Sequence, residues 1–381
     1  PLGQVPGLAD AVDIWRRAHA SGRPEAAAFP TGGPQPVRHA DGSFKLLGAG
    51  VVPPVGTTRV QDFAEVGTWL SQRLLAPLAV HLQGRAHWIV SPDGPLAQLP
   101  FEALPYGDTR QPAVASAEIH YTQSLSVFAA SRDLQSRYRS IEGRQDLFAM
   151  GNAQYEDQRS PGDRVSSSQE RLRGLRLRDA SQLRDLDGLW PDLPGTEAEV
   201  KSVAALFAGS SSVHLGEAAT EQRLQALNAQ GELRRYRYLL LAAHGYLSPD
   251  QPSLSSVVLG LQQRTPEADG YVTAAEWPAY DLRSELTVLS ACDSGVGKVV
   301  GGEGVMGLPF ALFVAGNVNT LLTLWPVDDR ATAEFVAAFF ARVKAGAEAS
   351  QALAATKLEF TRHRRWNHPA YWAAFVLVGA G

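Results

Sequence analysis

Short apolar runs alternate with longer amphipathic stretches over the second half of the chain. Mostly apolar runs of about six residues, rich in Leu, Val and Thr, occupy residues 238–243, 286–291 and 318–325. A continuous run of this length predicts a strand that is covered on both faces. Stretches of about 10 to 15 residues with apolar positions at helical spacing lie between and after these runs. The alternation predicts an α/β fold with a doubly wound, mostly parallel sheet and helices on both faces.

The pattern divides the chain into three parts. Residues 1–58 predict a short helix and then a Gly- and Pro-rich lead-in of connecting or partner-facing surface. Residues 59–145 predict a smaller α/β half with a small sheet of its own, packed against the rest. Residues 146–381 predict the main unit.

Helix starts can be predicted from capping residues. Either Ser124 or Ser126, and further along Thr196 and Thr220, begin stretches with helical spacing, where a side-chain oxygen can accept an N–H of the first turn. Glu199 follows Thr196 by three residues, which is the spacing of a capping box.

Composition narrows the class of protein. The net charge of −4 and the charged fraction of 19% give no electrostatic case for binding nucleic acid or an acidic membrane surface. One cysteine in 381 residues excludes an intramolecular disulfide framework, so a reducing, cytoplasmic location is expected. No apolar run reaches the roughly 18 residues that span a bilayer. The start, PLGQVPGLAD, lacks the pattern of a signal peptide.

A histidine and the single cysteine follow two of the apolar runs. His244 and Cys292 each stand just past the carboxyl end of a predicted strand, where reactive groups of parallel sheets gather. A free thiol is mostly protonated at neutral pH, and a neighbouring imidazole can remove its proton and later protonate a leaving amine. The pair is therefore the candidate base and nucleophile for attack on an acyl carbon.

Backbone N–H groups near this pair can bind a developing oxyanion. Gly245 and Cys292 itself offer such donors at tight turns. Asp293, next to the nucleophile, either shapes the turn or contacts the histidine and substrate; both readings stay open.

No metal or cofactor is expected. A zinc site needs clustered ligands, whereas the other candidate histidines are scattered: His81, His87, His214, His363 and His368. The segment GVGKVVGGEG has the glycines of a phosphate loop but no closing Gly-Lys-Ser/Thr. Residues 92–96, PDGPL, predict a turn.

Several ordered motifs together resemble one family. The segments YLLLAAHGYL, VLSACDSGVG, GEGVMGLPFALFVAGNVNTLLTLWPVDD and HPAYWAAFVLVGAG resemble the CHAT domain, the caspase- and separase-related protease module of bacteria. SPDGPLAQLPFEAL and YTQSLSVF resemble its amino-terminal half. The resemblance spans roughly residues 61–381. Its departures are mild: Ser294 stands where the family often has Thr, and the LPFALF helix lacks the usual Arg.

The resemblance implies a caspase-like fold and cleavage of peptide bonds by a Cys–His dyad, with His244 as base and Cys292 as nucleophile. Residues 59–145 would be a degenerate, pseudo-protease half and residues 146–381 the catalytic half. It also implies a role in bacterial immunity, with a protein substrate such as a gasdermin-like effector and an upstream sensor as partners.

The end of the third run offers a specificity pocket. Asp328 and Asp329 follow Trp325 and, by the strand order 2-1-3-4-5-6 expected of this fold, lie beside the Cys292 strand. A partly desolvated carboxylate there favours a basic P1 residue, and the resemblance to separase, which cuts after arginine, falls on Asp329. The two aspartates equally fit an N-cap and first turn of the next helix, so one can cap while the other lines the pocket.

Other interpretations remain beside the endopeptidase. A scaffold or switch module that mainly binds a partner protein is the alternative. A small-ester hydrolase would need a Gly-x-Ser-x-Gly elbow, which the sequence lacks. The Arg-rich stretch 153–187 predicts an exposed loop or, alternatively, an autoprocessed one.

Overall fold

The computed structural model describes residues 5–20, 29, 33–108, 111–155, 180–186, 189–248, 251–262, 264–290 and 303–381. Most of the Arg-rich stretch 153–187 lies outside these ranges. None of the helices within them is long and apolar enough to cross a membrane.

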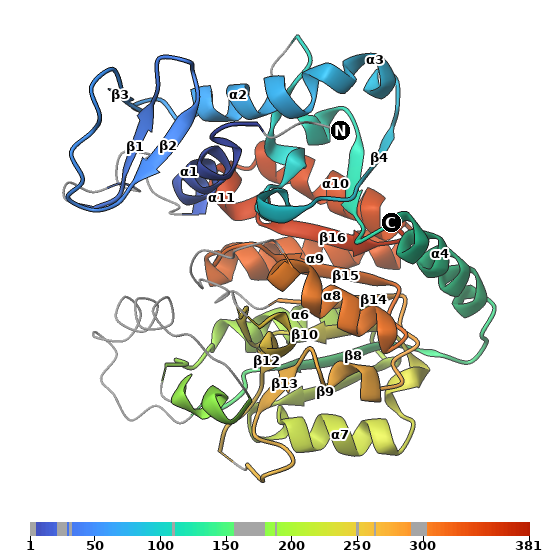
Figure 1. Ribbon diagram of the computed structural model, residues 1–381. Helices are drawn as coiled ribbons and strands as arrows, with labels where there is room; N and C mark the ends of the chain where they lie inside the picture. The colour runs from blue at the N-terminus through green and yellow to red at the C-terminus, as the bar shows by residue number, and fades with distance from the viewer. Residues whose placement is uncertain are drawn as a thin grey trace.

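One eight-stranded sheet forms the centre of the molecule (Figure 1). Its strands, in spatial order, are β4 (His87–Val90), β7 (Glu118–Tyr121), β16 (Phe375–Gly379), β15 (Asn319–Thr323), β14 (Leu286–Leu289), β10 (Tyr236–Leu241), β8 (Gln145–Gly151) and β9 (Ser211–Leu215). All neighbours are parallel except β15 and β16. The predicted α/β class is confirmed, and the strands from β8 onward follow the expected order 2-1-3-4-5-6.

The amino-terminal half adds two strands to this sheet and also holds a small two-stranded sheet of its own, β5 (Pro105–Tyr106) with β6 (Gln111–Pro112). Strands β4 and β7 continue the sheet beyond β16, with Val378 of β16 opposite Tyr121 of β7. Every residue of β16 is buried, so its outer edge must be covered, and a further strand satisfies its backbone groups. The division at residues 58 and 145 stays a prediction.

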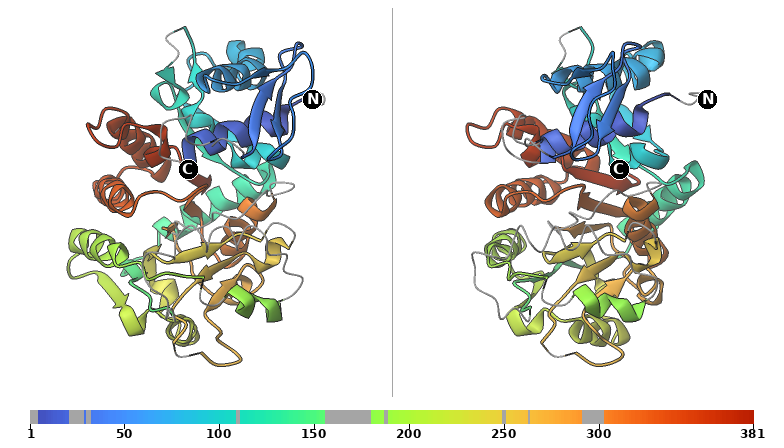
Figure 2. Two further views of the ribbon diagram at one scale, coloured as in Figure 1. Left: turned by 90° about the vertical axis from the view of Figure 1, so that its left-hand side faces the viewer. Right: turned by 60° about the vertical axis from the view of Figure 1, so that its left-hand side comes forward.

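The lead-in is more ordered than its composition predicts. Strands β1 (Gln35–Arg38), β2 (Phe44–Leu47) and β3 (Thr58–Arg59) form a separate antiparallel sheet. Figure 2 shows these blue elements at the end of the molecule opposite the yellow segments around residues 220–280. The small sheet therefore lies at one end, away from the strands that precede the candidate residues His244 and Cys292.

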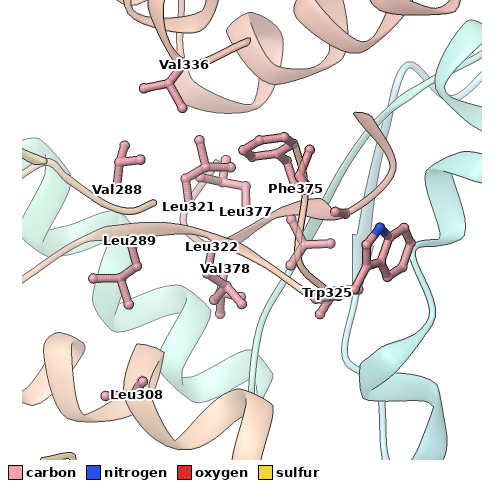
Figure 3. Close-up of a cluster of buried hydrophobic side chains, with 14 of the residues drawn as sticks. Val288, Leu289, Leu308, Leu321, Leu322, Trp325, Val336, Phe375, Leu377 and Val378 are labelled. Atoms are coloured by element: carbon pink, nitrogen blue, oxygen red, sulfur yellow. The ribbon is translucent and has the colours of Figure 1, made fainter. Parts of the chain in front are cut away.

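Helices cover both faces of the large sheet. Helices α6 (Gly195–Leu206), α9 (Asp329–Lys344) and α10 (Ala349–Thr361) pack side by side, whereas α8 (Glu303–Val314) lies on the opposite face. In Figure 3, Val336 of α9 faces Leu321, and Leu308 of α8 lies on the other side of the sheet. The alternation of side chains along each strand supplies both apolar layers. The other α-helices within the described residues are α1 (Leu8–Ala20), α2 (Ala64–Leu74), α3 (Ala79–Leu82), α4 (Leu125–Arg139), α7 (Glu221–Ala229) and α11 (Pro369–Trp372).

Two of the three predicted caps are confirmed. The hydroxyl of Ser124 accepts the Val127 N–H at 3.2 Å, and that of Thr220 accepts the Arg223 N–H at 3.3 Å. Thr196 is not a cap, because α6 already begins at Gly195. The capping box with Glu199 is therefore wrong as well.

A buried ion pair ties the amino-terminal half to α10. Nζ of Lys357 lies 2.9 Å from Oε1 of Glu102, and the two side chains are 0% and 1% exposed. The Tyr121 hydroxyl donates to the other carboxylate oxygen and accepts the Phe101 N–H at 2.8 Å. These contacts join the segment after β4 to β7 and to α10.

Candidate active site

His244 lies at the carboxyl end of β10, as the sequence predicts. Strand β10 ends at Leu241, and His244 opens β11 (His244–Tyr246). Strand β11 pairs with β12 (Ser256–Val258), which pairs with β13 (Tyr271–Thr273). The histidine therefore belongs to a small antiparallel sheet that follows the carboxyl end of β10 in the large sheet. The residue is 0% exposed. Its backbone is thus held in β11, opposite Val258 of β12, directly after β10.

The chain before α6 holds the imidazole. Nε2 of His244 lies 2.6 Å from the Pro191 carbonyl oxygen. A carbonyl can only accept, so Nε2 carries the hydrogen and the lone pair of the neutral ring lies on Nδ1. The rings of Tyr155 and Trp190 pack against the imidazole with centroids 4.8 and 5.1 Å away. The ring is oriented with Nδ1 as the basic atom.

Both aromatic neighbours are anchored in turn. The Tyr155 hydroxyl accepts the His244 N–H at 3.3 Å and donates to the Val258 carbonyl at 2.9 Å. Nε1 of Trp190 donates to the Tyr271 hydroxyl at 2.9 Å. Sequence reasoning missed Tyr155, Trp190 and Pro191; the only signal was the dense Trp-Pro and Leu-Pro-Gly sequence after a long polar stretch.

The structure describes the strand that precedes Cys292, the candidate nucleophile. Cys292 and Asp293 lie outside the described residues. Strand β14 lies beside β10 in parallel, with Leu289 opposite Leu241, and the Ser290 N–H donates to the Leu241 carbonyl at 3.0 Å. Leu241 and Leu289 are thus opposite each other, and the candidate residues His244 and Cys292 each lie three positions after them in the sequence. Gly245 is placed in β11, and its role as an oxyanion donor stays a prediction.

The two aspartates after β15 have different surroundings. Asp328 caps α9, where its side chain accepts the N–H groups of Arg330 and Ala331 at 3.0 and 3.2 Å. Asp329 is directed toward α6, because a Cβ on Gly195 would come within 3.0 Å of its own Cβ. Trp325 is 1% exposed and donates to the Ala370 carbonyl at 3.0 Å. Its substrate contact stays a prediction, as does the specificity role of both aspartates.

A third carboxyl group lies close to Asp329. Glu199 of α6 is 2% exposed. Burial, above all, raises the pKa of its carboxyl to about 8; the Ser290 hydroxyl opposes this and the Asp329 charge adds to it. Glu199 is therefore predominantly protonated at neutral pH. Within the described part of the chain, no three His, Cys, Asp or Glu side chains are grouped to hold a metal ion.

Strand order and helices on both faces define an α/β protein with a doubly wound, mostly parallel sheet, and a histidine follows the carboxyl end of its strand β10. The sequence model of the CHAT domain matches residues 64–380, and the chain belongs to the CHAT domain family.

Two curated relatives match half of the chain. Tetratricopeptide repeat protein 28 of Mus musculus is 27% identical over 217 residues, and its Homo sapiens counterpart is 28% identical over 218 residues. Each match covers 50% of this chain and 9% of the relative, so the chain spans about a tenth of their length. Among solved structures, separase in the Saccharomyces cerevisiae separase–securin complex is similar, with 15% identity, a TM-score of 0.39 and coverage of 75% of this chain and 15% of that one.

Proposed function

We propose that this chain is a cysteine endopeptidase with Cys292 as nucleophile and His244 as base. The main support is the register of β10 and β14, in which Leu241 and Leu289 are opposite each other. The two candidate residues each follow this pair by three positions. Neighbouring strands lie about 4.8 Å apart, so equal extensions from them bring the two side chains to the same edge of the sheet.

The geometry of the histidine supports the same chemistry. With Nε2–H bonded to the Pro191 carbonyl, Nδ1 accepts the thiol proton and the thiolate attacks the scissile carbonyl carbon. The N–H groups of Gly245 and Cys292 stabilise the oxyanion. The imidazolium then protonates the amine as the C–N bond breaks, and water hydrolyses the thioester to release the acid and the thiol.

The basic-P1 preference is proposed for Asp329. Asp328 is engaged as the helix cap, whereas Asp329 faces α6 at the carboxyl end of the strand next to β14. We place the substrate contacts there, with Asp293 and Trp325 as further candidates. A cytoplasmic protein substrate, for instance a gasdermin-like effector in a bacterial defence pathway, and an upstream sensor fit this reading.

The single cysteine makes the first test direct. Alkylation of the chain by iodoacetamide reports Cys292 alone, so the pH dependence of its rate gives the thiol pKa. His244→Ala should lower this rate at pH 7 by roughly 10-fold or more, whereas His81→Ala, on an exposed helix, should not. Cys292→Ala should abolish peptide cleavage without unfolding the protein. Equal alkylation rates in the wild type and His244→Ala would refute the dyad.

A scaffold or switch module is the second candidate. The matched relatives are named for their tetratricopeptide repeats, and the chain corresponds to a small share of each. In such a protein the domain could mainly bind a partner. Failure of Cys292 to react with peptidyl electrophiles, despite a folded protein, would favour this reading.

A further inference from the structure

The large sheet ends on one side in a strand whose outer edge is open. Among the described strands, β4 is the outermost on its side, and no described residue pairs with its outer edge. The carbonyl groups of Ala86 and Val90 accept N–H groups from the chain around β7, so they point toward β7. Because backbone groups alternate in direction along a strand, the N–H and C=O groups of His87 and Ile89 point away from the sheet. Figure 1 shows β4 at the rim of the molecule.

This edge has little of the usual protection of an open strand. Natural proteins cover such an edge or place charges and prolines along it, because its unpaired groups bind another strand. Strand β4 is short, but it contains neither a lysine nor a proline, and Ile89 at its centre is 43% exposed. Val80 of the preceding helix α3 is 86% exposed. The edge is therefore a partly apolar surface that a further strand can cover.

A second copy of β4 is complementary to this edge. In an antiparallel pair with a two-fold axis at Ile89, this residue lies opposite its own counterpart, and His87 lies opposite Ser91 of the other copy. By the same alternation, Ser91 also directs its backbone groups outward. The two copies therefore exchange N–H···O bonds at the positions whose groups are unpaired in one copy.

Charges and apolar side chains match in the same register. Arg85 of each copy comes opposite Asp93 of the other, so the dimer contains this pair twice. Both residues are exposed, and neither side chain has an ion pair with another described residue. Val90 of one copy comes opposite Trp88 of the other, where Trp88 lines a groove of about 620 Å³. Opposite charges and apolar side chains that face each other across two strands stabilise the pairing.

We propose that the outer edge of β4 is a homodimer interface, in which two copies of this chain pair antiparallel through β4 with Ile89 on the two-fold axis. The two large sheets then form one continuous sheet. An isologous contact of this kind closes on itself and gives a dimer, not a fibre. The ladder is short, so the interface belongs to the small and reversible class. The inference is independent of the proposed peptidase activity, because the interface contains no residue of the candidate active site.

Sedimentation velocity over a concentration series up to about 0.5 mM measures the dissociation constant of the dimer. The wild type should show a monomer–dimer equilibrium that depends on concentration. Ile89→Lys places two like charges at the axis and should weaken the dimer by roughly 10-fold or more. The matched control is Val213→Lys, because Val213 is 38% exposed on β9, the edge strand on the opposite side of the sheet. It should leave the dissociation constant unchanged.

Charge reversal tests the register. Arg85→Glu or Asp93→Arg alone makes two pairs repulsive and should weaken the dimer roughly 5-fold or more. The double variant restores both attractions and should return the dissociation constant to within about 2-fold of the wild type. Both residues are exposed and lie outside β4, so these variants separate loss of the interface from loss of the fold.

A disulfide tests the position of the two-fold axis. In a Cys292→Ala background, Ile89→Cys places two Cα atoms about 5.5 Å apart across the axis, which is within the range of a disulfide. This variant should form a disulfide-linked dimer on mild oxidation, and Val213→Cys should not. The proposal is overturned by a wild type that stays monomeric, by an Ile89→Lys variant that dimerises like the wild type, or by charge reversals that the double variant does not restore.

Discussion

Substitution of the buried Lys357–Glu102 ion pair measures how much this contact between the amino-terminal half and α10 contributes to the free energy of unfolding. We consider Lys357→Met, which keeps the volume and removes the charge. The pair has an N–O distance of 2.9 Å and is nearly fully buried, and burial lowers the pKa of the lysine. Removing one partner of such a pair leaves an uncompensated buried charge and costs about 3–5 kcal/mol. Tyr121 still donates to Glu102, so the loss should lie toward the lower end.

Urea unfolding followed by tryptophan fluorescence measures this loss. The double variant Lys357→Met with Glu102→Gln keeps an acceptor for Tyr121 and removes both charges, so it should recover at least about 2 kcal/mol relative to the sum of the single variants. Lys201→Met, at an exposed ion pair, is the control and should change stability by no more than about 0.5 kcal/mol. A loss below about 1 kcal/mol for Lys357→Met, or additive single effects, would refute the reasoning.

Three further changes probe the site. Burial raises the pKa of Glu199 in the folded protein from its ordinary value of 4.5 to about 8. The folded state therefore binds more protons than the unfolded state, and the free energy of unfolding should fall by up to about 1.4 kcal/mol per pH unit as pH rises from about 4.5 to 8. Urea titrations at several pH values should show this slope in the wild type and not in Glu199→Gln. Tyr155→Phe removes the hydroxyl that links the His244 N–H to the Val258 carbonyl, and it should lower the free energy of unfolding by about 1–3 kcal/mol. An unchanged midpoint of urea unfolding would contradict a stabilising role of these two hydrogen bonds. Asp328→Ala removes the helix cap and should lower the free energy of unfolding by about 1 kcal/mol. It should leave the preference for Arg at P1 unchanged, which cleavage of matched peptides with different P1 residues would check.

Local sequence signals predict the central strands well. The runs ending before His244 and Cys292 are continuous and apolar, and they become neighbouring buried strands in the expected order. Ser124 and Thr220 cap their helices because an unsatisfied N–H lies within reach of each hydroxyl. Thr196 has the same local pattern, yet its hydroxyl accepts the Asn152 N–H and donates to the Leu193 carbonyl, so tertiary contacts override the local signal.

Long-range contacts explain what the sequence did not predict. Nothing near residues 87–121 indicates that these strands extend the sheet of the main unit, because that pairing depends on a strand more than 250 residues later. The residues that hold His244 likewise come from a segment about 50 to 90 positions earlier. Glu199 has the sequence pattern of a capping residue, and only the packing of α6 on α9 turns it toward Asp329 and Ser290.

The arrangement of strands explains how the parts of the proposed site depend on one another. Strands β10, β14 and β15 are consecutive and parallel, and their carboxyl ends carry the candidate base, nucleophile and acidic residue in that order. A parallel sheet fixes such residues at one edge through its hydrogen-bond register, so the register needs β15 to be held on its far side. Strand β16 does this, and β7 with β4 then covers β16. The amino-terminal half carries no candidate catalytic residue, but it contributes to the proposed site by completing the sheet. Destabilising this half through Lys357→Met should therefore disturb the proposed Cys–His dyad as well as lower the stability of the fold.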